Sequence, residues 1–201
     1  MKKILYLFLI TFLQSGIAKA QDYVQQIEKH REHYRAEFLT SSNSPLKKED
    51  LAYLRFYEPD STYVVHATFE RTTESVPFEM PTYSGKKKNY VKYGLLTCAI
   101  NEKKQSLGVY RSLDLAALPQ DINYLFIPFK DNTSGKETYG GGRYLDVKTT
   151  DVKDGMLMLD FNKAYNPYCA YSSGYNCPIP PKENVLDVAI KAGEMNYAKD
   201  N

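Results

Sequence analysis

Hydrophobic positions change along the chain from a helical period to a strand-like alternation near residue 60. The helical stretch covers residues 22–39, and its apolar positions are Tyr23, Ile27, Tyr34 and Phe38. Charged residues fill the positions between them, which is typical of an amphipathic helix. Asp22 is a suitable N-cap. We place three polar side chains on the solvent-exposed face of this helix: His30, Arg31 and His33.

Segments rich in β-branched and aromatic residues follow, and turn residues bound each of them. The predicted strands cover residues 62–70, 94–100, 106–111, 124–129, 156–161 and 185–190. A short helical turn is predicted over 45–51, because Pro45 suits a first helical position. No helical pattern separates the strands. We therefore predict a mainly β (α+β) fold, a barrel-like or strongly curved antiparallel sheet with the N-terminal helix packed on it.

The first 20 residues follow the pattern of a secretory signal peptide. Two lysines precede an apolar run over residues 4–13, and Ala18-Lys19-Ala20 forms a small-x-small cleavage site. The run is shorter than the roughly 20 apolar residues that span a bilayer. We expect export to the periplasm or the medium after removal of residues 1–20. Residues 21–201 then form a single β-rich domain without a transmembrane segment.

Charge and composition exclude two classes of protein. Removing residues 1–20 takes away three lysines and no acidic residue, so the formal net charge falls from +2 to −1. A near-neutral exported domain lacks the basic field that nucleic-acid binding needs. The chain is 43% hydrophobic and 13% aromatic, which argues against a disordered protein.

The three cysteines are Cys98, Cys169 and Cys177. Cys98 lies in an apolar strand-like run and is expected to be a buried small hydrophobe. Seven residues separate Cys169 from Cys177, so a disulfide between them is sterically possible and would persist in an oxidising compartment. Free thiols remain the alternative. No second cysteine pair accompanies them and the histidines lie far upstream, so we expect neither a metal nor a cofactor.

A block of unusual motifs occupies the last third of the chain. It comprises residues 138–146 (TYGGGRYLD), residues 160–167 (DFNKAYNP), Cys169-Ala170, Cys177-Pro178 with Pro180-Pro181, and Ala192-Gly193-Glu194. In order and spacing these motifs resemble a bacterial family known as domain of unknown function 1684, over most of the chain after residue 20. The family name implies no established activity. The resemblance therefore implies a shared domain and supplies no mechanism.

The glycine motif suggests an anion site. Gly140, Gly141 and Gly142 permit positive φ and close backbone approach, and Arg143 presents five donors to a carboxylate or phosphate. Backbone N–H groups and the guanidinium would together cradle an anionic ligand. The alternative is a bulged turn in which Arg143 pairs with a local carboxylate, Asp146 or Glu137.

The leading hypothesis is an exported domain that binds a small anionic or polar ligand, or an envelope polymer. Asn162 and Asn166 would orient the ligand by their amides, and tyrosines would stack against it. The alternative for both amides is to hold a turn. The predicted ligand site consists of Gly140, Gly141, Gly142, Arg143, Tyr144, Asn162, Tyr165 and Asn166.

Two other hypotheses remain open. A hydrolase would use two of the carboxyl groups of Glu137, Asp160 and Glu194 as acid and base. A structural domain would use the motif block as turns, a buried arginine pair and a proline-clamped loop. Convergence of Arg143 and these polar groups on an open pocket would favour a site. A buried and mutually satisfied arrangement would mean that the block specifies the fold, and would move the search for function to the exposed surface.

Overall fold

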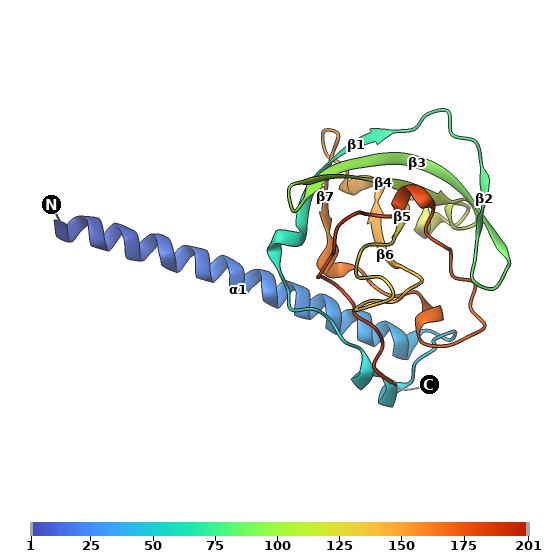
Figure 1. Cartoon of the computed structure of the whole chain (residues 1–201), viewed down its shortest axis with the longest axis horizontal. Helices are drawn as coiled ribbons and strands as arrows, with labels where there is room; N and C mark the ends of the chain where they lie inside the picture. The colour runs from blue at the N-terminus through green and yellow to red at the C-terminus, as the bar shows by residue number, and fades with distance from the viewer. Residues whose placement is uncertain (1, 200–201) are drawn as a thin grey trace.

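A single long helix precedes a mostly antiparallel sheet that curls into a half-barrel (Figure 1). The computed structural model describes residues 2–199, with side chains from residue 21 onward, so the predicted signal peptide lies outside the side chains described. The helices and strands are α1 (Lys2–Thr40), β1 (Val64–Arg71), β2 (Phe78–Pro81), β3 (Lys87–Ile100), β4 (Lys103–Ser112), α2 (Leu113–Ala116), β5 (Tyr124–Phe129), β6 (Arg143–Lys148) and β7 (Met156–Asp160). Short 3₁₀ helices cover Lys48–Tyr53, Ser61–Tyr63, Pro119–Asp121, Thr149–Asp151, Phe161–Lys163, Tyr168–Ala170 and Lys182–Asn184.

The strand order leaves two edges that face each other. The sheet runs β6-β5-β4-β3-β1-β7, and β2 pairs with the first part of β3. A register shift between Lys92 and Gly94 interrupts the β3–β4 ladder. Such a bulge bends a strand and increases its twist. We call the opening between the two edge strands, β6 and β7, the seam.

One tight turn joins the two strands of the longest hairpin, β3 and β4, and another leads into β7 beside the seam. Asn101 and Glu102 both have positive φ (49° and 64°) and join β3 to β4. Asp154 has a φ of 49° and begins the two-residue turn that leads into β7. Two successive residues with positive φ suit the twist of a two-residue hairpin. Both positions were expected from the turn residues of the sequence.

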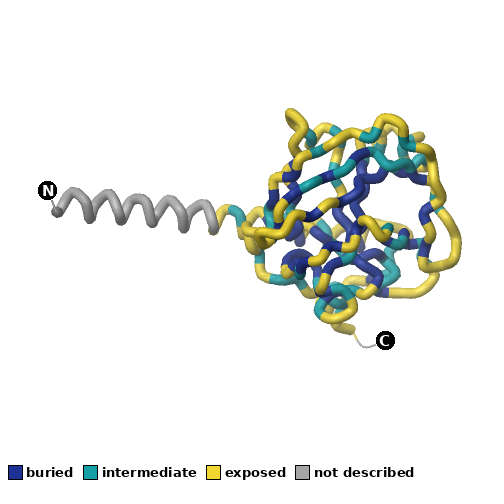
Figure 2. Tube along the Cα trace, turned by 45° about the horizontal axis from the view of Figure 1, so that its top comes forward, coloured by how far each residue is buried: buried dark blue, intermediate teal, exposed yellow. Residues whose placement is uncertain are grey.

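An extended C-terminal segment fills the concave side of the half-barrel. Its buried side chains alternate with more exposed ones and pack against the apolar residues of all six strands of the curled sheet; they are Leu186, Val188, Ile190 and Ala192. Figure 2 shows the buried parts of the chain gathered on the inside. The prediction of a strand over 185–190 is wrong, because this stretch makes one isolated bridge, Lys130 with Val185. The alternation that suggested a strand comes from insertion into the core.

Helix α1 differs from its prediction in two respects. Asp22 lies within the helix and is not an N-cap, because α1 begins at Lys2. Arg31 is buried and not on a solvated face. It donates to the Tyr57 carbonyl at 2.6 Å, and its guanidinium lies 4.8 Å from the ring centre of Phe56. Among the residues that the structure describes, no helix is both long and apolar enough to cross a membrane.

Two strands were missed by the sequence analysis. β6 begins at Arg143, inside the motif that was interpreted as a glycine turn with a ligand-binding arginine. β2 is only four residues long, and the first half of β3 is rich in lysine, so neither shows a clear alternation of hydrophobicity. In both places exposed or chemically unusual side chains obscured the period of two.

The backbone around Gly193 predicts a large effect of a single methyl group. Gly193 has a φ of +77°, and a Cβ there would lie 2.6 Å from the Ala164 carbonyl oxygen. Gly85 has a similar φ of +81° with open space around it. We expect Gly85→Ala to lower the free energy of unfolding by about 1 kcal/mol through φ alone, and Gly193→Ala by about 3 kcal/mol or more.

Urea unfolding of both variants and the wild type measures the difference. Equal losses for Gly193→Ala and Gly85→Ala would show that the close packing of the C-terminal segment contributes nothing at this position.

Candidate functional site

Arg143 lies inside the half-barrel and is 1% exposed. Its Nη2 donates to Asp131 Oδ2 at 2.7 Å and to the Ile190 carbonyl at 2.8 Å. Its Nη1 donates to the carbonyls of Ala192 and Glu194. The guanidinium therefore holds the C-terminal segment in the half-barrel and does not reach solvent. The prediction that Arg143 contacts a ligand is corrected, because protein acceptors occupy both terminal nitrogens and its Nε is buried.

The carboxylate partner of Arg143 is Asp131, and neither Asp146 nor Glu137. Asp131 follows β5, and its Oδ1 accepts from the N–H of Thr133 at 2.6 Å and from the Thr133 hydroxyl. Both side chains of the ion pair are fully buried. The sequence signal for Asp131 was the Asp-x-Thr pattern of an Asx turn. This pattern predicts a turn but does not show that Asp131 pairs with Arg143.

Gly142 is the member of the glycine triplet whose backbone requires glycine. It has a φ of +93°, and a Cβ there would lie 2.5 Å from the carbonyl oxygen of Phe129. Gly140 is exposed, and the Gly141 carbonyl accepts from the Tyr83 hydroxyl at 3.0 Å. Gly142 serves close packing against β5, and Gly140 and Gly141 form the turn that the alternative interpretation expected.

The two asparagines are buried and hold backbone. Asn162 donates to the Asp60 carbonyl at 2.8 Å, and its Oδ1 accepts from the Asp60 N–H at 2.9 Å. Asn166 donates from its amide to the Met195 carbonyl at 2.8 Å. Both contacts join segments distant in sequence. The interpretation of these amides as ligand contacts is therefore replaced by one in which they fix loops.

Glu194 joins the C-terminal segment to helix α1. It is 0% exposed, and its carboxylate accepts from the hydroxyls of Tyr171 at 2.6 Å and Tyr34 at 3.0 Å. The Asn166 N–H also donates to it at 2.8 Å. Burial raises the pKa of Glu194 to about 7, against the opposing effect of these hydrogen bonds.

The three carboxylates proposed for a hydrolase lie in different surroundings. Glu137 accepts from the Tyr57 hydroxyl at 3.1 Å and faces the ammonium of Lys191 at 3.4 Å. Asp160 ends β7 and accepts from the Tyr23 hydroxyl at 3.0 Å. Among the described residues, Glu137, Asp160 and Glu194 share no hydrogen-bond partner. Of the three, Asp160 alone lines the cleft described below.

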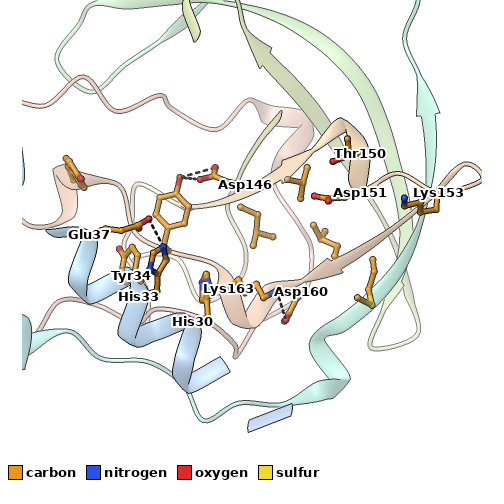
Figure 3. Close-up of a pocket in the computed structure, with 16 residues that line it drawn as sticks. His30, His33, Tyr34, Glu37, Asp146, Thr150, Asp151, Lys153, Asp160 and Lys163 are labelled. Atoms are coloured by element: carbon orange, nitrogen blue, oxygen red, sulfur yellow. Dashed lines mark hydrogen bonds and ion pairs between the residues drawn. The ribbon is translucent and has the colours of Figure 1, made fainter. Parts of the chain in front are cut away.

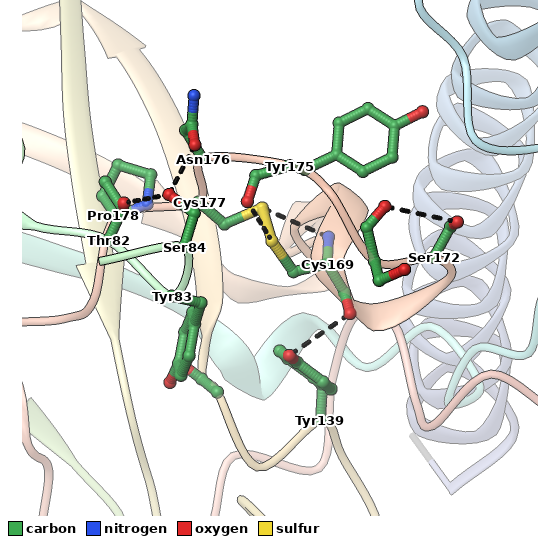
Figure 4. Close-up of a disulfide and its surroundings, with 12 residues drawn as sticks. Thr82, Tyr83, Ser84, Tyr139, Cys169, Ser172, Tyr175, Asn176, Cys177 and Pro178 are labelled. Atoms are coloured by element: carbon green, nitrogen blue, oxygen red, sulfur yellow. Dashed lines mark hydrogen bonds between the residues drawn. A yellow bond between two sulfur atoms is a disulfide. The ribbon is translucent and has the colours of Figure 1, made fainter. Parts of the chain in front are cut away.

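Cys169 and Cys177 form a disulfide (Figure 4). Their Cα atoms lie 6.2 Å apart, and the Cys169 N–H donates to Cys177 Sγ at 3.2 Å. Cys98 is a buried free thiol in β3. In the described part of the chain, no group of three His, Cys, Asp or Glu side chains is placed to hold a metal ion.

A cleft of about 1040 Å³ opens at the seam, between α1 and the two edge strands (Figure 3). β6 pairs at Tyr144 with Tyr165 through both backbone hydrogen bonds, at 2.9 and 3.1 Å, and closes one end. Beyond this bridge the seam is open. We call this space the seam cleft; its lining is His30, His33, Tyr34, Glu37, Leu145, Asp146, Val147, Thr150, Asp151, Lys153, Met158, Leu159, Asp160, Lys163, Tyr165 and Tyr168.

Carboxylates outnumber ammonium groups in the lining of the seam cleft. The carboxylates are Glu37, Asp146, Asp151 and Asp160, and the ammonium groups are Lys153 and Lys163. His33 lies 3.4 Å from Glu37 on α1, and Lys163 lies 3.9 Å from Asp160. Figure 3 shows the helix side chains facing those of β6, β7 and their connecting turn. The cleft therefore presents a mixed field with an excess of negative charge.

Two tyrosine hydroxyls hold the carboxylate of Asp146 in the seam cleft. The Tyr165 hydroxyl lies 2.9 Å and 3.0 Å from its two oxygens, and the Tyr124 hydroxyl donates to it at 2.8 Å. Asp146 is exposed to the solvent of the cleft, yet desolvation by the protein mass around the cleft raises the pKa of its carboxyl to about 6. The two tyrosine hydroxyls act in the opposite direction. Sequence analysis named Asp146 only as a partner for Arg143.

Fold and cleft together define a class of protein, a curled half-barrel with a helix along its open seam. The chain belongs to the family described as Protein of unknown function (DUF1684), whose model matches residues 49–195. It is similar to an uncharacterized protein of Haloarcula marismortui known from a solution NMR structure. The two are 30% identical, the match covers 89% of this chain and 96% of that one, and the TM-score is 0.68. A search of curated proteins found no match.

The surroundings of Glu194 predict a pH-dependent stability. Because its pKa is about 7 in the folded protein and near 4.5 when exposed, the folded state binds the extra proton between these values. The free energy of unfolding should therefore fall as pH rises from about 4.5 to 7, by about 3 kcal/mol from this group. Glu194→Gln should remove this part of the slope, since a neutral amide has no proton to lose.

Chemical unfolding at a series of pH values, for the wild type and Glu194→Gln, measures the effect. Glu74→Gln, on an exposed loop, serves as the matched control and should follow the wild type. A wild-type slope that persists in Glu194→Gln would assign the pH dependence to other groups.

Proposed function

We propose that the protein binds a small polar ligand that carries a cationic group, and that the seam cleft is its site. One observation carries the proposal: the excess of carboxylates over lysines around a cavity of about 1040 Å³. Ligand sites of this kind are concave, near this size, and combine apolar walls with a few polar groups. A cavity closed at one end suits a small molecule better than an extended polymer.

The geometry of the motif block supports a site in the seam cleft in place of one around Arg143. Arg143 was the reason to expect an anionic ligand, and its guanidinium is occupied by Asp131 and three carbonyls. Tyr165 is the member of the predicted ligand set that lines the seam cleft, where its hydroxyl fixes Asp146. No corresponding observation favours a hydrolase, because Glu137 and Glu194 lie away from this cleft.

We also propose that the protein is exported and that residues 1–20 are removed. The signal-like sequence supports the proposal, and a disulfide between Cys169 and Cys177 suits an oxidising compartment. Glu37 and the two lining histidines lie in the part of α1 that cleavage after Ala20 retains.

The ligand proposal predicts a preference for cations. In a thermal-shift screen of residues 21–201, we expect small amines, amino acids and amino sugars to raise the melting temperature more than dicarboxylates do. Glu37→Gln and Asp151→Asn should each weaken the best amine by about fivefold in calorimetry, because each removes one partly solvated carboxylate charge.

Asp187→Asn is the control for this experiment, because Asp187 is exposed outside the cleft. It should leave the affinity unchanged. A preference for dicarboxylates, a screen without any stabilising amine, or an affinity indifferent to Glu37→Gln and Asp151→Asn would each contradict a cation site at the seam.

Export predicts a defined N-terminus. When the full chain is expressed in a bacterium with a C-terminal tag, intact mass spectrometry of the periplasmic and medium fractions should find a protein that begins at Gln21. Denatured, it should contain one free thiol, from Cys98. Recovery of the full-length chain from the cytoplasm alone would overturn the proposal. A substitution of Ala18 and Ala20 by bulky residues provides the matched uncleaved control.

A further inference from the structure

A second pocket lies next to the seam cleft and differs from it in chemistry. Its volume is about 370 Å³, and Tyr165 and Tyr168 line both spaces. We call it the tyrosine pocket; its lining is Asn43, Lys88, Tyr90, Leu115, Tyr124, Phe126, Tyr144, Tyr165, Pro167, Tyr168, Tyr175, Asn176, Cys177 and Pro178. This lining contains no Asp or Glu and one lysine. Its charge is therefore positive, where that of the seam cleft is negative.

Aromatic rings form the walls of the tyrosine pocket. Tyr90 stacks on Phe126 with ring centres 5.8 Å apart, and Phe126 meets Tyr144 edge to face at 4.7 Å. Tyr168 and Tyr175 form another edge-to-face pair at 5.2 Å. These contacts hold the rings in fixed orientations, and fixed aromatic faces bind planar rings at low entropic cost.

Most hydroxyls around the pocket already have partners. Tyr144 donates to the Pro178 carbonyl at 2.5 Å, and Tyr175 donates to the Asn43 carbonyl at 3.2 Å. Tyr90 and Tyr168 are the exceptions, because neither hydroxyl makes a hydrogen bond to any residue that the structure describes. Tyr90 is the more buried of the two, at 5% exposed, and it lines the pocket. A hydroxyl that lacks a protein partner, on a side chain that lines a cavity, is suited to an acceptor on a ligand.

Lys88 supplies the positive charge in the lining of the tyrosine pocket. It lies in β3 two residues before Tyr90 and is half-buried. Within the described residues it makes no ion pair, whereas its neighbour Lys87 pairs with Glu79 at 2.5 Å. Burial lowers the pKa of Lys88, and the charge of Asp114 offsets this in part. An ammonium that makes no salt bridge, beside aromatic walls, favours an anion over a cation in the same space.

We infer that the tyrosine pocket is a binding site for a small planar aromatic acid. The ring would stack between the tyrosine faces, and the acidic group would accept hydrogen bonds from the Tyr90 hydroxyl and the Lys88 ammonium. The volume suits a single ring with substituents, near the lower limit of small-molecule sites. The inference does not depend on the ligand of the seam cleft, because Lys88 and Tyr90 line only the tyrosine pocket.

Benzoate is the probe that tests the inference, with benzamide as its neutral analogue and benzylamine as its cationic one. Titration of ¹⁵N-labelled residues 21–201 should shift amide signals of β3, β5 and residues 175–178. We expect benzoate to bind about tenfold more tightly than benzamide, because a charge-assisted hydrogen bond is lost in the amide. Benzylamine should bind more weakly than both.

Two substitutions in the pocket have matched controls. Lys88→Met keeps the aliphatic stem and should weaken benzoate about tenfold, whereas Lys87→Met, one residue away, should leave it unchanged. Tyr90→Phe keeps the ring and should weaken benzoate about threefold without affecting benzamide packing. Signal dispersion and melting temperature report that each variant is folded.

Each opposing result overturns the inference. Equal affinities for benzoate and benzamide would remove the need for an anion, and tighter binding of benzylamine would reverse the charge preference. Benzoate shifts confined to the seam cleft, or an unchanged affinity in Lys88→Met, would place the acid elsewhere. A failure here leaves the cation preference of the seam cleft intact, since Glu37 and Asp151 lie outside this pocket.

Discussion

The buried ion pair between Arg143 and Asp131 is the interaction on which the rest of the structure depends. Arg143 begins β6, and its guanidinium holds three carbonyls of the C-terminal segment inside the half-barrel. Removal of either partner would leave the other charge buried and unpaired, at a cost of about 3–5 kcal/mol. Without this anchor, the segment that fills the core would lose its polar attachment.

Filling the half-barrel in this way determines where a ligand can bind. Many barrels hold ligands in their interior, but here Val188, Ile190 and Ala192 occupy that space. The seam cleft and the tyrosine pocket lie where the sheet fails to close, at the seam and beside it. Because α1 crosses the seam, the walls of the cleft come from segments far apart in sequence, and its charges meet only in the folded chain.

The sequence predicted the curved antiparallel sheet, the helix packed on it and most strand positions, because these depend on local periodicity. β5 was predicted with the observed bounds, since its apolar residues and flanking turns are unambiguous. The predictions that failed concern residues whose roles depend on contacts with distant parts of the chain. The role of Arg143 depends on Asp131 and Ile190, and no local pattern indicates that a strand-like alternation such as 185–190 belongs to a core segment without a ladder. The seam cleft was not predicted either, because its walls come from segments far apart in the sequence.

Tyrosine explains how two pockets of opposite charge can share a wall. Tyr165 turns its hydroxyl to Asp146 on the seam side, while its ring meets that of Tyr144 at 5.8 Å and lines the tyrosine pocket. Tyr124 does the same from β5, with its hydroxyl on Asp146. A side chain with an apolar body and a polar tip is thus suited to a boundary between an acidic cleft and an aromatic one. Phenylalanine at either position would leave Asp146 with fewer donors and tend to raise its pKa further, so the wall that shapes one pocket also sets the charge of the other.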